Sequence, residues 1–455
     1  MLKLSFYGGA QEVTGACYLL ETASAKILID CGLFQCPQFC TKKNEDDFPF
    51  DPGSIDAVVI THGHIDHIGR IPKLVRKGFS GVIYSTNPTK DFAGIMLFDS
   101  LGVMEKEAHS EKKELLYQEE DVERTLGQWE GVEYNQKFSI KDISVTLRNA
   151  GHILGSAMIE CETGSGDSKI VLAATGDLGN SPTLLLDPPD HIEGADYLII
   201  ESAYGDRVHE DTSTRRAKLE RIIEDTFSRG GVLMIPAFSL ERTQELLYEL
   251  NDLAENHRVP RIPIFMDSPL AIQAVDVYKK YPKQFNEEAE RLLRGGDDLF
   301  RFPGLVFTKN TEDSKNIADV APPKVIIAGA GMMQGGRILH HAKRYLPDPK
   351  NTLLFIGYQA AGSLGRRLYD NAKEVVIHGE TIPVRATIKA IGGYSAHADS
   401  DGLFSFVEHM ADTLKKVFVV QGEPKASLYL VQRIRDNLGI DAIAPKFGES
   451  FELSN

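Results

Sequence analysis

The sequence predicts an α/β protein whose two strand-rich ends flank a middle segment of alternating strands and helices. Short apolar runs separated by glycine and serine fill residues 1–206, as expected of strands. Over residues 207–383 such runs alternate with amphipathic helices, the pattern of a doubly wound parallel sheet. Strand-rich sequence returns over residues 384–455. Because 455 residues are too many for one ordinary core, we expect separate domains with these boundaries.

The composition is that of a globular protein in a reducing compartment. No apolar run approaches the length of a membrane span, and the first residues lack the pattern of a signal peptide. The five cysteines are sparse and odd in number, which favours free thiols. We therefore expect a cytoplasmic protein. The formal charge of −15 argues against a general nucleic-acid coat but is compatible with a locally basic binding surface.

Residues 61–69 (THGHIDHIG) contain the densest cluster of potential metal-binding side chains in the chain. His62, His64, Asp66 and His67 lie between an apolar strand at 57–60 and the start of a helical pattern. Imidazole and carboxylate groups suit a borderline cation such as zinc. Alternate side chains of a turn converge, so His62 and His64 can bind one ion while Asp66 and His67 bind another. With thirteen histidines in the whole chain, such a cluster is not expected by chance.

Other polar residues also follow predicted strands. His152 comes after the strand at 145–149, Asp177 after that at 170–174, and Glu201 ends the run LIIE. Asp30 ends the run KILID, where it is a metal ligand, a group that orients a ligand, or part of a plain turn. Open α/β architectures place their sites at strand ends, so we predict that these residues share one site. His397 lies between a strand and a helix, and Gln421 follows the strand at 417–420.

Helices are predicted elsewhere by apolar periodicity. A charged helical segment covers 89–128, including 104–118, and the middle of the chain has helices at 214–228, 241–255, 271–281 and 337–345. Glycine-rich turns there are accompanied by Arg337, Tyr358, Arg366 and Arg367. Glycine turns with arginines can bind phosphate, or the glycines can serve tight turns alone. Without a Walker-type lysine, a nucleotide cofactor is disfavoured.

A set of motifs follows in order along the chain: HGHIDH, GHILGS, TGDLG, ESAYGDR, PAFSLERTQELL, DSPLA, GAGMMQGGR, GYQAAGSLGRRL and YSAHAD. Together they resemble the β-CASP branch of the metallo-β-lactamase-fold nucleases. HxHxDH marks only the superfamily, whereas ESAYGDR with the later GYQ and SAHAD segments marks the branch. The resemblance implies a metallo-β-lactamase αββα sandwich built from residues 1–206 and 384–455, with a β-CASP parallel α/β domain at 207–383 inserted between them.

The same resemblance implies two zinc ions and a role for each site residue. The first zinc would be held by His62, His64 and His152, and the second by Asp66 and His67, with Asp177 bridging the two. Asp30 would lie beside the site. Glu201 and His397 resemble the acid–histidine pair of the family, in which the histidine protonates the leaving oxygen. Relatives often pair, so a homodimer is also expected.

The chain departs from the family pattern at two places, and the first concerns the second zinc. Where relatives have His-Gly-Glu, this chain has Gln421-Gly422-Glu423, and an amide is a poorer zinc ligand than imidazole. A His-Gly-Glu sequence occurs earlier, at His378, which is a substitute ligand or a coincidence. Ala330 also stands where relatives often have a hydroxyl residue, which removes one possible phosphate contact.

These observations lead to one functional hypothesis with three alternatives. We expect a zinc-dependent ribonuclease that hydrolyses single-stranded RNA in processing or decay, with Asp66, Glu201 and His397 catalytic. Arginines of the insert would contact the RNA backbone. The alternatives are a non-catalytic RNA-binding protein, favoured by Gln421, a DNA-directed nuclease, and a metallohydrolase of small esters. The large insert and its arginines argue against the last.

Overall fold

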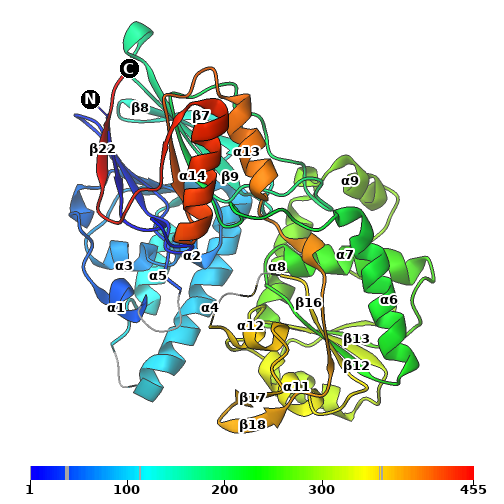
Figure 1. The fold of residues 1–455 in the computed structure, drawn as a ribbon. Coiled ribbons are helices and arrows are strands. Elements are labelled where there is room, and N and C mark those ends of the chain that lie inside the picture. Colours follow the sequence, from blue (N-terminus) through cyan, green and yellow to red (C-terminus); the bar gives the residue numbers. More distant parts are fainter. Residues whose placement is uncertain (1, 36–39, 112–113, 358, 360–361) are drawn as a thin grey trace. The chain divides into compact units, whose positions relative to one another are not determined.

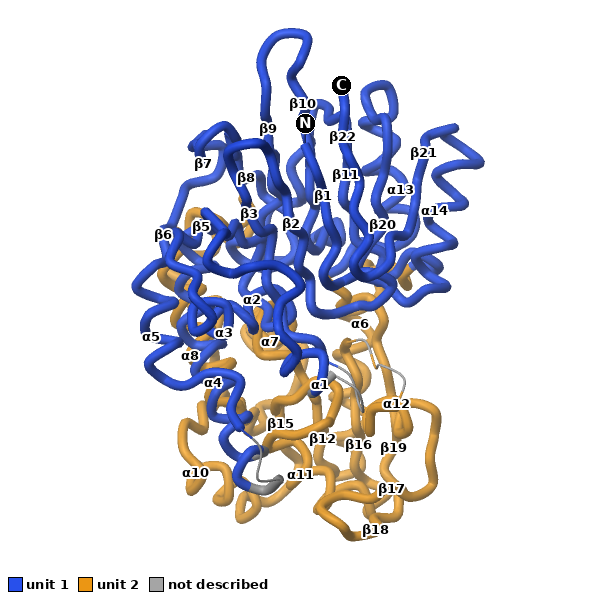
Figure 2. The backbone as a smooth tube through the Cα atoms, turned by 90° about the vertical axis from the view of Figure 1, so that its left-hand side faces the viewer, with its two compact units in different colours: residues 1–208, 397–455 blue, residues 209–396 orange. Residues whose placement is uncertain are grey.

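The computed structural model describes residues 2–455 apart from 36–39, 112–113, 358 and 360–361. The chain divides into two compact units, which Figure 2 colours separately. Unit 1 consists of Met1–Val208 and His397–Asn455, and unit 2 of His209–Ala396. Every helix within the described part of the chain is too short or too polar to span a bilayer.

Unit 1 contains two sheets of seven strands each. The first sheet consists of Ser450–Leu453 (β22), Leu2–Phe6 (β1), Tyr18–Glu21 (β2), Lys26–Ile29 (β3), Ala57–Val59 (β4), Val82–Thr86 (β5) and Trp129–Val132 (β6), in that spatial order. The second consists of Asp441–Ile443 (β21), Lys416–Val420 (β20), Tyr197–Glu201 (β11), Ile170–Ala174 (β10), Ala157–Thr163 (β9), Ile143–Asn149 (β8) and Lys137–Ile140 (β7). Because β22 pairs antiparallel with β1, the two chain ends meet in one sheet (Figure 1).

Helices cover the outer faces of both sheets. On the first sheet lie Ile65–Ile68 (α2), Ile71–Arg76 (α3), Asn87–Glu111 (α4) and Glu119–Gly127 (α5), and on the second lie Ser400–His409 (α13) and Pro424–Leu438 (α14). Cys40–Glu45 (α1) and the 3-10 helices Pro52–Ser54 (η1) and Gly166–Ser168 (η2) occur in connections.

Strand alternation separates three apolar layers in unit 1. Successive side chains of a strand face opposite sides of the sheet. Leu20 of β2 packs between the sheets with Leu172 of β10, whereas Leu19 packs against the helices α2 to α5. Leu403 of α13 and Leu430 of α14 pack against the outer face of the second sheet. This arrangement is an αββα sandwich, which confirms the predicted fold.

Unit 2 is a parallel α/β domain. Its strands are Leu305–Phe307 (β14), Ile264–Asp267 (β13), Lys324–Ala328 (β15), Val232–Pro236 (β12), Thr352–Phe355 (β16) and Thr387–Ala390 (β19), in that order, and all neighbours pair parallel. All residues of β12, β15 and β16 are buried, as in sheets covered on both faces. The surrounding helices are Arg215–Ser228 (α6), Arg242–Glu255 (α7), Pro269–Lys280 (α8), Glu287–Arg294 (α9), Thr311–Asn316 (α10), Ile338–Tyr345 (α11) and Leu364–Tyr369 (α12), with 3-10 helices Thr212–Thr214 (η3), Pro282–Gln284 (η4), Ile317–Asp319 (η5) and Gly392–Tyr394 (η6).

Two features differ from the expectations. Residues 384–396, which we had placed with the C-terminal domain, belong to unit 2, because β19 pairs with β16 at the edge of its sheet. The prediction of a helix over residues 104–118 is also wrong in its second half. The helix α4 ends at Glu111, and α5 begins at Glu119 because Gln118 and Asp121 form a capping box.

Candidate metal centre

One edge of the αββα sandwich gathers the polar residues that follow its strands. His62 and His64 lie between β4 and α2, His152 follows β8, Asp177 follows β10, and Glu201 is the last residue of β11. Gly176 permits the turn before Asp177, because it has a φ of +53° and a Cβ atom there would lie 2.6 Å from the Thr61 side chain. The strand ends thus converge on one site.

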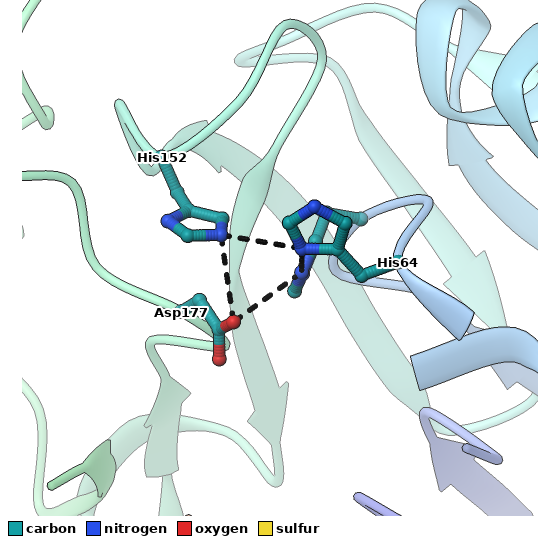
Figure 3. Close-up of side chains that lie close together, drawn as sticks. His64, His152 and Asp177 are labelled. Carbon is teal, nitrogen blue, oxygen red and sulfur yellow. Dashed lines mark hydrogen bonds and ion pairs between the residues drawn. The ribbon is translucent and has the colours of Figure 1, made fainter. Parts of the chain in front are cut away.

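Four of these side chains are spaced to bind a single metal ion. The ligand atoms of His62, His64, His152 and Asp177 all lie within 4.8 Å of one another. Figure 3 shows the three labelled side chains, His64, His152 and Asp177, facing a common point. Nδ1 of His64 is 3.0 Å from Nε2 of His62 and 3.4 Å from Nε2 of His152. Oδ2 of Asp177 is 3.4 and 3.5 Å from the same two Nε2 atoms. A tetrahedral ion with bonds of about 2.1 Å requires separations of about 3.4 Å, so the donors fit zinc.

The protonation states also suit a metal. Burial lowers the pKa of His62, His64 and His152, so all three rings favour the neutral form that offers a lone pair. Burial alone would raise the pKa of Asp177. Attraction to His67, His62 and His397 outweighs that effect and holds its pKa well below the ordinary value. The fourth candidate ligand, Asp177, is therefore ionised.

Thr61 orients the His62 ring. Its hydroxyl donates to Oδ2 of Asp30 at 2.8 Å, which leaves its oxygen to accept from Nδ1 of His62 at 3.1 Å. With the proton on Nδ1, Nε2 of His62 keeps its lone pair toward the metal position. Sequence reasoning did not single out Thr61, although its place directly before His62 at a strand end was a usable signal.

Asp30 is a buried group that positions His67. The Asp30 Oδ1 atom accepts from the Thr61 backbone N–H at 2.8 Å, and Oδ2 lies 2.7 Å from Nδ1 of His67. It has a φ of +58° and is fully buried. Of the three roles left open by the sequence, the structure places Asp30 in contact with a histidine.

The residues expected to bind a second zinc are close to one another but do not form a comparable cluster. Nε2 of His67 is 3.3 Å from Oδ1 of Asp177 and 3.9 Å from Oδ2 of Asp66. Among the residues described, these three are not a group whose ligand atoms all lie within 4.8 Å. Gln421 reaches the same place, with Nε2 2.9 Å from both Nε2 of His67 and Oδ1 of Asp177.

The surroundings of His67 favour positive charge. Burial lowers its pKa, but the carboxylates of Asp177, Asp30 and Asp66 outweigh that effect and raise the pKa of His67 well above its ordinary value. Burial raises the pKa of Asp66. The three carboxylates therefore stabilise positive charge or an N–H donor at this position.

Glu201 and His397 form a pair beside the metal position. Glu201 is fully buried, and His397 is partly exposed. Burial raises the pKa of Glu201, and the neighbouring His397 opposes that shift. The His397 ring lies 4.6 Å from that of His152, centroid to centroid. The pair is therefore adjacent to the ion that the four ligands would hold.

The candidate substrate-binding residues lie in unit 2. Nη1 of Arg337 donates hydrogen bonds to Oδ1 of Asp267 at 2.7 Å and to the Thr308 carbonyl at 3.0 Å. Arg366 pairs with Asp370, and Arg367 is exposed on α12. Tyr358 lies outside the described residues.

His378 occupies the turn of a hairpin rather than a ligand cluster. Glu374–Ile377 (β17) and Glu380–Pro383 (β18) pair antiparallel, and the two residues between them, His378 and Gly379, have φ values of +50° and +77°. Two such residues form a type I′ turn, which explains the His-Gly-Glu sequence here. The exposed His378 is in neither His/Asp/Glu cluster found in the described chain.

Comparison with known proteins identifies the family. Residues 19–176 match the metallo-beta-lactamase superfamily domain, 243–368 the Beta-Casp domain, and 381–445 the Zn-dependent metallo-hydrolase RNA specificity domain. Ribonuclease TTHA0252 of Thermus thermophilus is 38% identical over 448 residues, which cover 98% of this chain and 99% of that protein. The chain belongs to the β-CASP branch of the metallo-β-lactamase-fold nucleases.

Other members of the β-CASP branch extend beyond the matched region. Transcription termination factor FttA of Methanocaldococcus jannaschii is 32% identical over 444 residues, which cover 95% of this chain and 69% of FttA. A protein of unknown function from Enterococcus faecalis V583 shares the fold, with a TM-score of 0.55 at 12% sequence identity. The structural match covers 99% of this chain and 100% of the Enterococcus chain. The matches to the metallo-beta-lactamase superfamily domain and to the Zn-dependent metallo-hydrolase domain, together with the His/Asp cluster, indicate a metal-binding site.

Proposed function

We propose that this protein is a zinc-dependent ribonuclease that hydrolyses phosphodiester bonds of single-stranded RNA. One observation carries the proposal: three imidazoles that favour the neutral form and the Asp177 carboxylate are spaced for a tetrahedral ion, beside the pair formed by His397 and the buried Glu201. The match of residues 381–445 to an RNA specificity domain and the 38% identity to a protein named as a ribonuclease support RNA as the substrate.

The residues of the site have separate tasks. His62, His64, His152 and Asp177 would hold the ion. When bound there, zinc lowers the pKa of water and neutralises charge on phosphoryl oxygens. Thr61 fixes the His62 tautomer, and Ser156 accepts the backbone N–H of His152 at 3.0 Å. These contacts fix the ligands before any ion arrives.

His397 would protonate the leaving oxygen. Its Nδ1 atom faces Glu201, so Nε2 is the nitrogen that can donate a proton to a substrate. The Glu201 Oε1 atom also accepts the Leu178 backbone N–H at 2.7 Å, and the Leu178 carbonyl accepts from the Ala398 N–H at 2.7 Å. Leu178 thus positions both the acid and the segment that carries His397. General acid catalysis of this kind contributes roughly 10²- to 10⁴-fold to the rate.

The test is cleavage of an end-labelled single-stranded RNA by the full-length protein, beside a DNA of the same sequence and an RNA duplex. We expect the single-stranded RNA to be cut, a chelator to abolish cutting, and added zinc to restore it. Cleavage of the DNA alone would contradict the ribonuclease assignment. Zinc-loaded protein that cuts no RNA would favour the non-catalytic alternative.

A further inference from the structure

We infer that the amide group of Gln421 occupies the position of the second metal ion, so that this chain binds a single zinc. The inference deepens the proposed function and relies on its first metal position. The family pattern implies two ions, and the four ligands of the first are present. The second position is different, because an uncharged side chain lies between the two groups expected to bind the ion.

The Gln421 Nε2 atom has the contacts that an ion would have. It lies 2.9 Å from Oδ1 of Asp177 and 2.9 Å from Nε2 of His67, two of the ligand atoms expected at the second position. Those two atoms are 3.3 Å apart, so a metal bonded to both on the side that faces the amide would overlap the amide nitrogen. The first position needs only Oδ2 of Asp177, so Oδ1 remains to accept the amide proton.

Hydrogen bonding fixes which end of the amide faces the site. The Asp177 carboxylate can only accept, so the group that touches it is the NH2 end. At the other end, the Tyr18 hydroxyl donates to Oε1 of Gln421 at 3.2 Å. Turning the amide over would bring its oxygen against Oδ1 of Asp177 and lose this bond. The amide therefore presents its nitrogen, which has no lone pair to offer a metal.

The His67 lone pair is occupied as well. Nδ1 of His67 donates to Asp30, which leaves Nε2 as the acceptor for the second N–H of the Gln421 amide in the neutral ring. Nε2 of His67 is therefore not available to an ion while the amide is in place.

The backbone holds Gln421 in this position. Its φ is +48°, its N–H donates to the Gly9 carbonyl at 2.6 Å, and its side chain is buried. The next residue, Gly422, packs so tightly that a Cβ atom would lie 2.3 Å from Oγ of Ser202. The side chain therefore starts from a fixed point beside His67, and withdrawing it would leave the NH2 group unpaired in a buried place.

The experiment counts zinc in the full-length protein. Wild type, Gln421→Glu and Gln421→His are loaded with excess zinc, desalted, and measured by elemental analysis and native mass spectrometry. Glutamate has the shape of glutamine but supplies a carboxylate ligand, and histidine supplies imidazole. Gln432→Glu is the matched control, since Gln432 is exposed on α14 and the change adds the same charge. Circular dichroism verifies that each variant is folded.

We expect one zinc per chain in wild type and Gln432→Glu, and two in Gln421→Glu and Gln421→His. Two zincs in wild type, or a count that stays at one in both Gln421 variants, would overturn the inference. A wild-type crystal measured at the zinc edge gives an independent result. One anomalous peak among His62, His64, His152 and Asp177 supports the inference, and a second peak beside His67 overturns it.

The zinc count separates this inference from the proposed function. Wild type that binds one zinc but cuts no RNA contradicts the ribonuclease assignment and leaves the inference intact. Wild type that binds two zincs and cuts RNA overturns the inference and leaves the ribonuclease assignment intact. A count of zero contradicts both.

Discussion

Nδ1 of His397 lies 3.1 Å from each carboxylate oxygen of Glu201. The carboxylate has no solvent exposure, whereas the His397 side chain is 28% exposed. A buried acid on one ring nitrogen fixes the ring orientation and stabilises the imidazolium form. The other nitrogen is thereby directed away from Glu201. This orientation is what a proton donor needs.

His397→Ala is expected to lower kcat for RNA cleavage by roughly 10²- to 10⁴-fold, because it removes the proton donor. Zinc content should not change, since the first ligand set does not include His397. The measurement is steady-state cleavage together with elemental analysis. His409→Ala, an exposed histidine of the same unit, is the control. Since Asp177, Glu201 and His397 also cluster within 4.8 Å, loss of zinc in His397→Ala would instead make His397 a ligand.

Glu201→Gln is expected to lower kcat by roughly 10²- to 10⁴-fold with little change in KM. The amide keeps the size of the side chain, but it directs either an NH2 group or a weaker acceptor at Nδ1 of His397. The ring then loses its fixed tautomer and the stabilisation of its charged form. Rates across a range of RNA concentrations separate the two parameters. A rise in KM at constant kcat would indicate that Glu201 serves substrate binding instead.

His152→Ala is expected to abolish both zinc binding and cleavage, because it removes one of four ligands. Binding to the folded state stabilises a protein, by about 2.7 kcal/mol at a ligand concentration of 100 Kd. A chelator should therefore lower the melting temperature of wild type but not that of His152→Ala. The exposed His191 provides the control variant, His191→Ala. A melting temperature of His152→Ala that still falls with chelator would contradict the assignment.

The sequence predicted features that depend on local pattern. Helices such as α6 and α7 begin within one residue of the expected positions, because apolar periodicity is a local property. The candidate metal ligands could be predicted for a related reason. His152 and Asp177 both follow strands, and strand ends meet at one edge of a sheet whatever the exact topology.

The pairing of strands and the contacts between distant side chains could not be predicted in the same way. The strand-rich sequence after residue 383 includes residues 387–390. No local sequence pattern determines whether this strand pairs with β16 in unit 2 or joins the second sheet of unit 1. The importance of Gln421 followed from the family resemblance, whereas its contact with Tyr18 joins positions 403 residues apart. Side-chain contacts over such separations follow from the complete fold.

Arg367→Ala is expected to weaken RNA binding more than Arg366→Ala. Arg367 is exposed, while the Arg366 guanidinium already pairs with Asp370 at 2.9 Å. Each lost contact with a phosphate of single-stranded RNA should reduce the slope of log K against log salt by about 0.7. Binding is measured by fluorescence anisotropy at several salt concentrations, in a His397→Ala background that prevents cleavage. Equal slopes in wild type and Arg367→Ala would exclude a phosphate contact by this residue.

The stability of unit 2 is expected to depend on a buried network around Asp267. Oδ1 of Asp267 accepts from Thr308 and Arg337 at 2.6 and 2.7 Å, and Oδ2 from Ser314 and His341 at 2.6 and 2.7 Å. Burial alone would raise the Asp267 pKa, but these four donors lower it well below its ordinary value. Breaking a buried charge network by removing one partner costs about 3 kcal/mol or more. Arg337 is therefore a structural partner of Asp267.

Asp267→Asn should accordingly unfold at a lower urea concentration than wild type at pH 7. A carboxyl group with a depressed pKa in the folded state stabilises above its unfolded pKa of about 3.9, and that contribution disappears as pH falls further. The difference between wild type and variant should therefore be full at pH 7 and smaller at pH 3, as followed by circular dichroism. Asp370→Asn removes an exposed carboxylate and should cost less than about 1 kcal/mol at either pH. A difference for Asp267→Asn that is equal at both pH values would mean that the carboxylate charge contributes nothing, and that only the shape of the side chain matters.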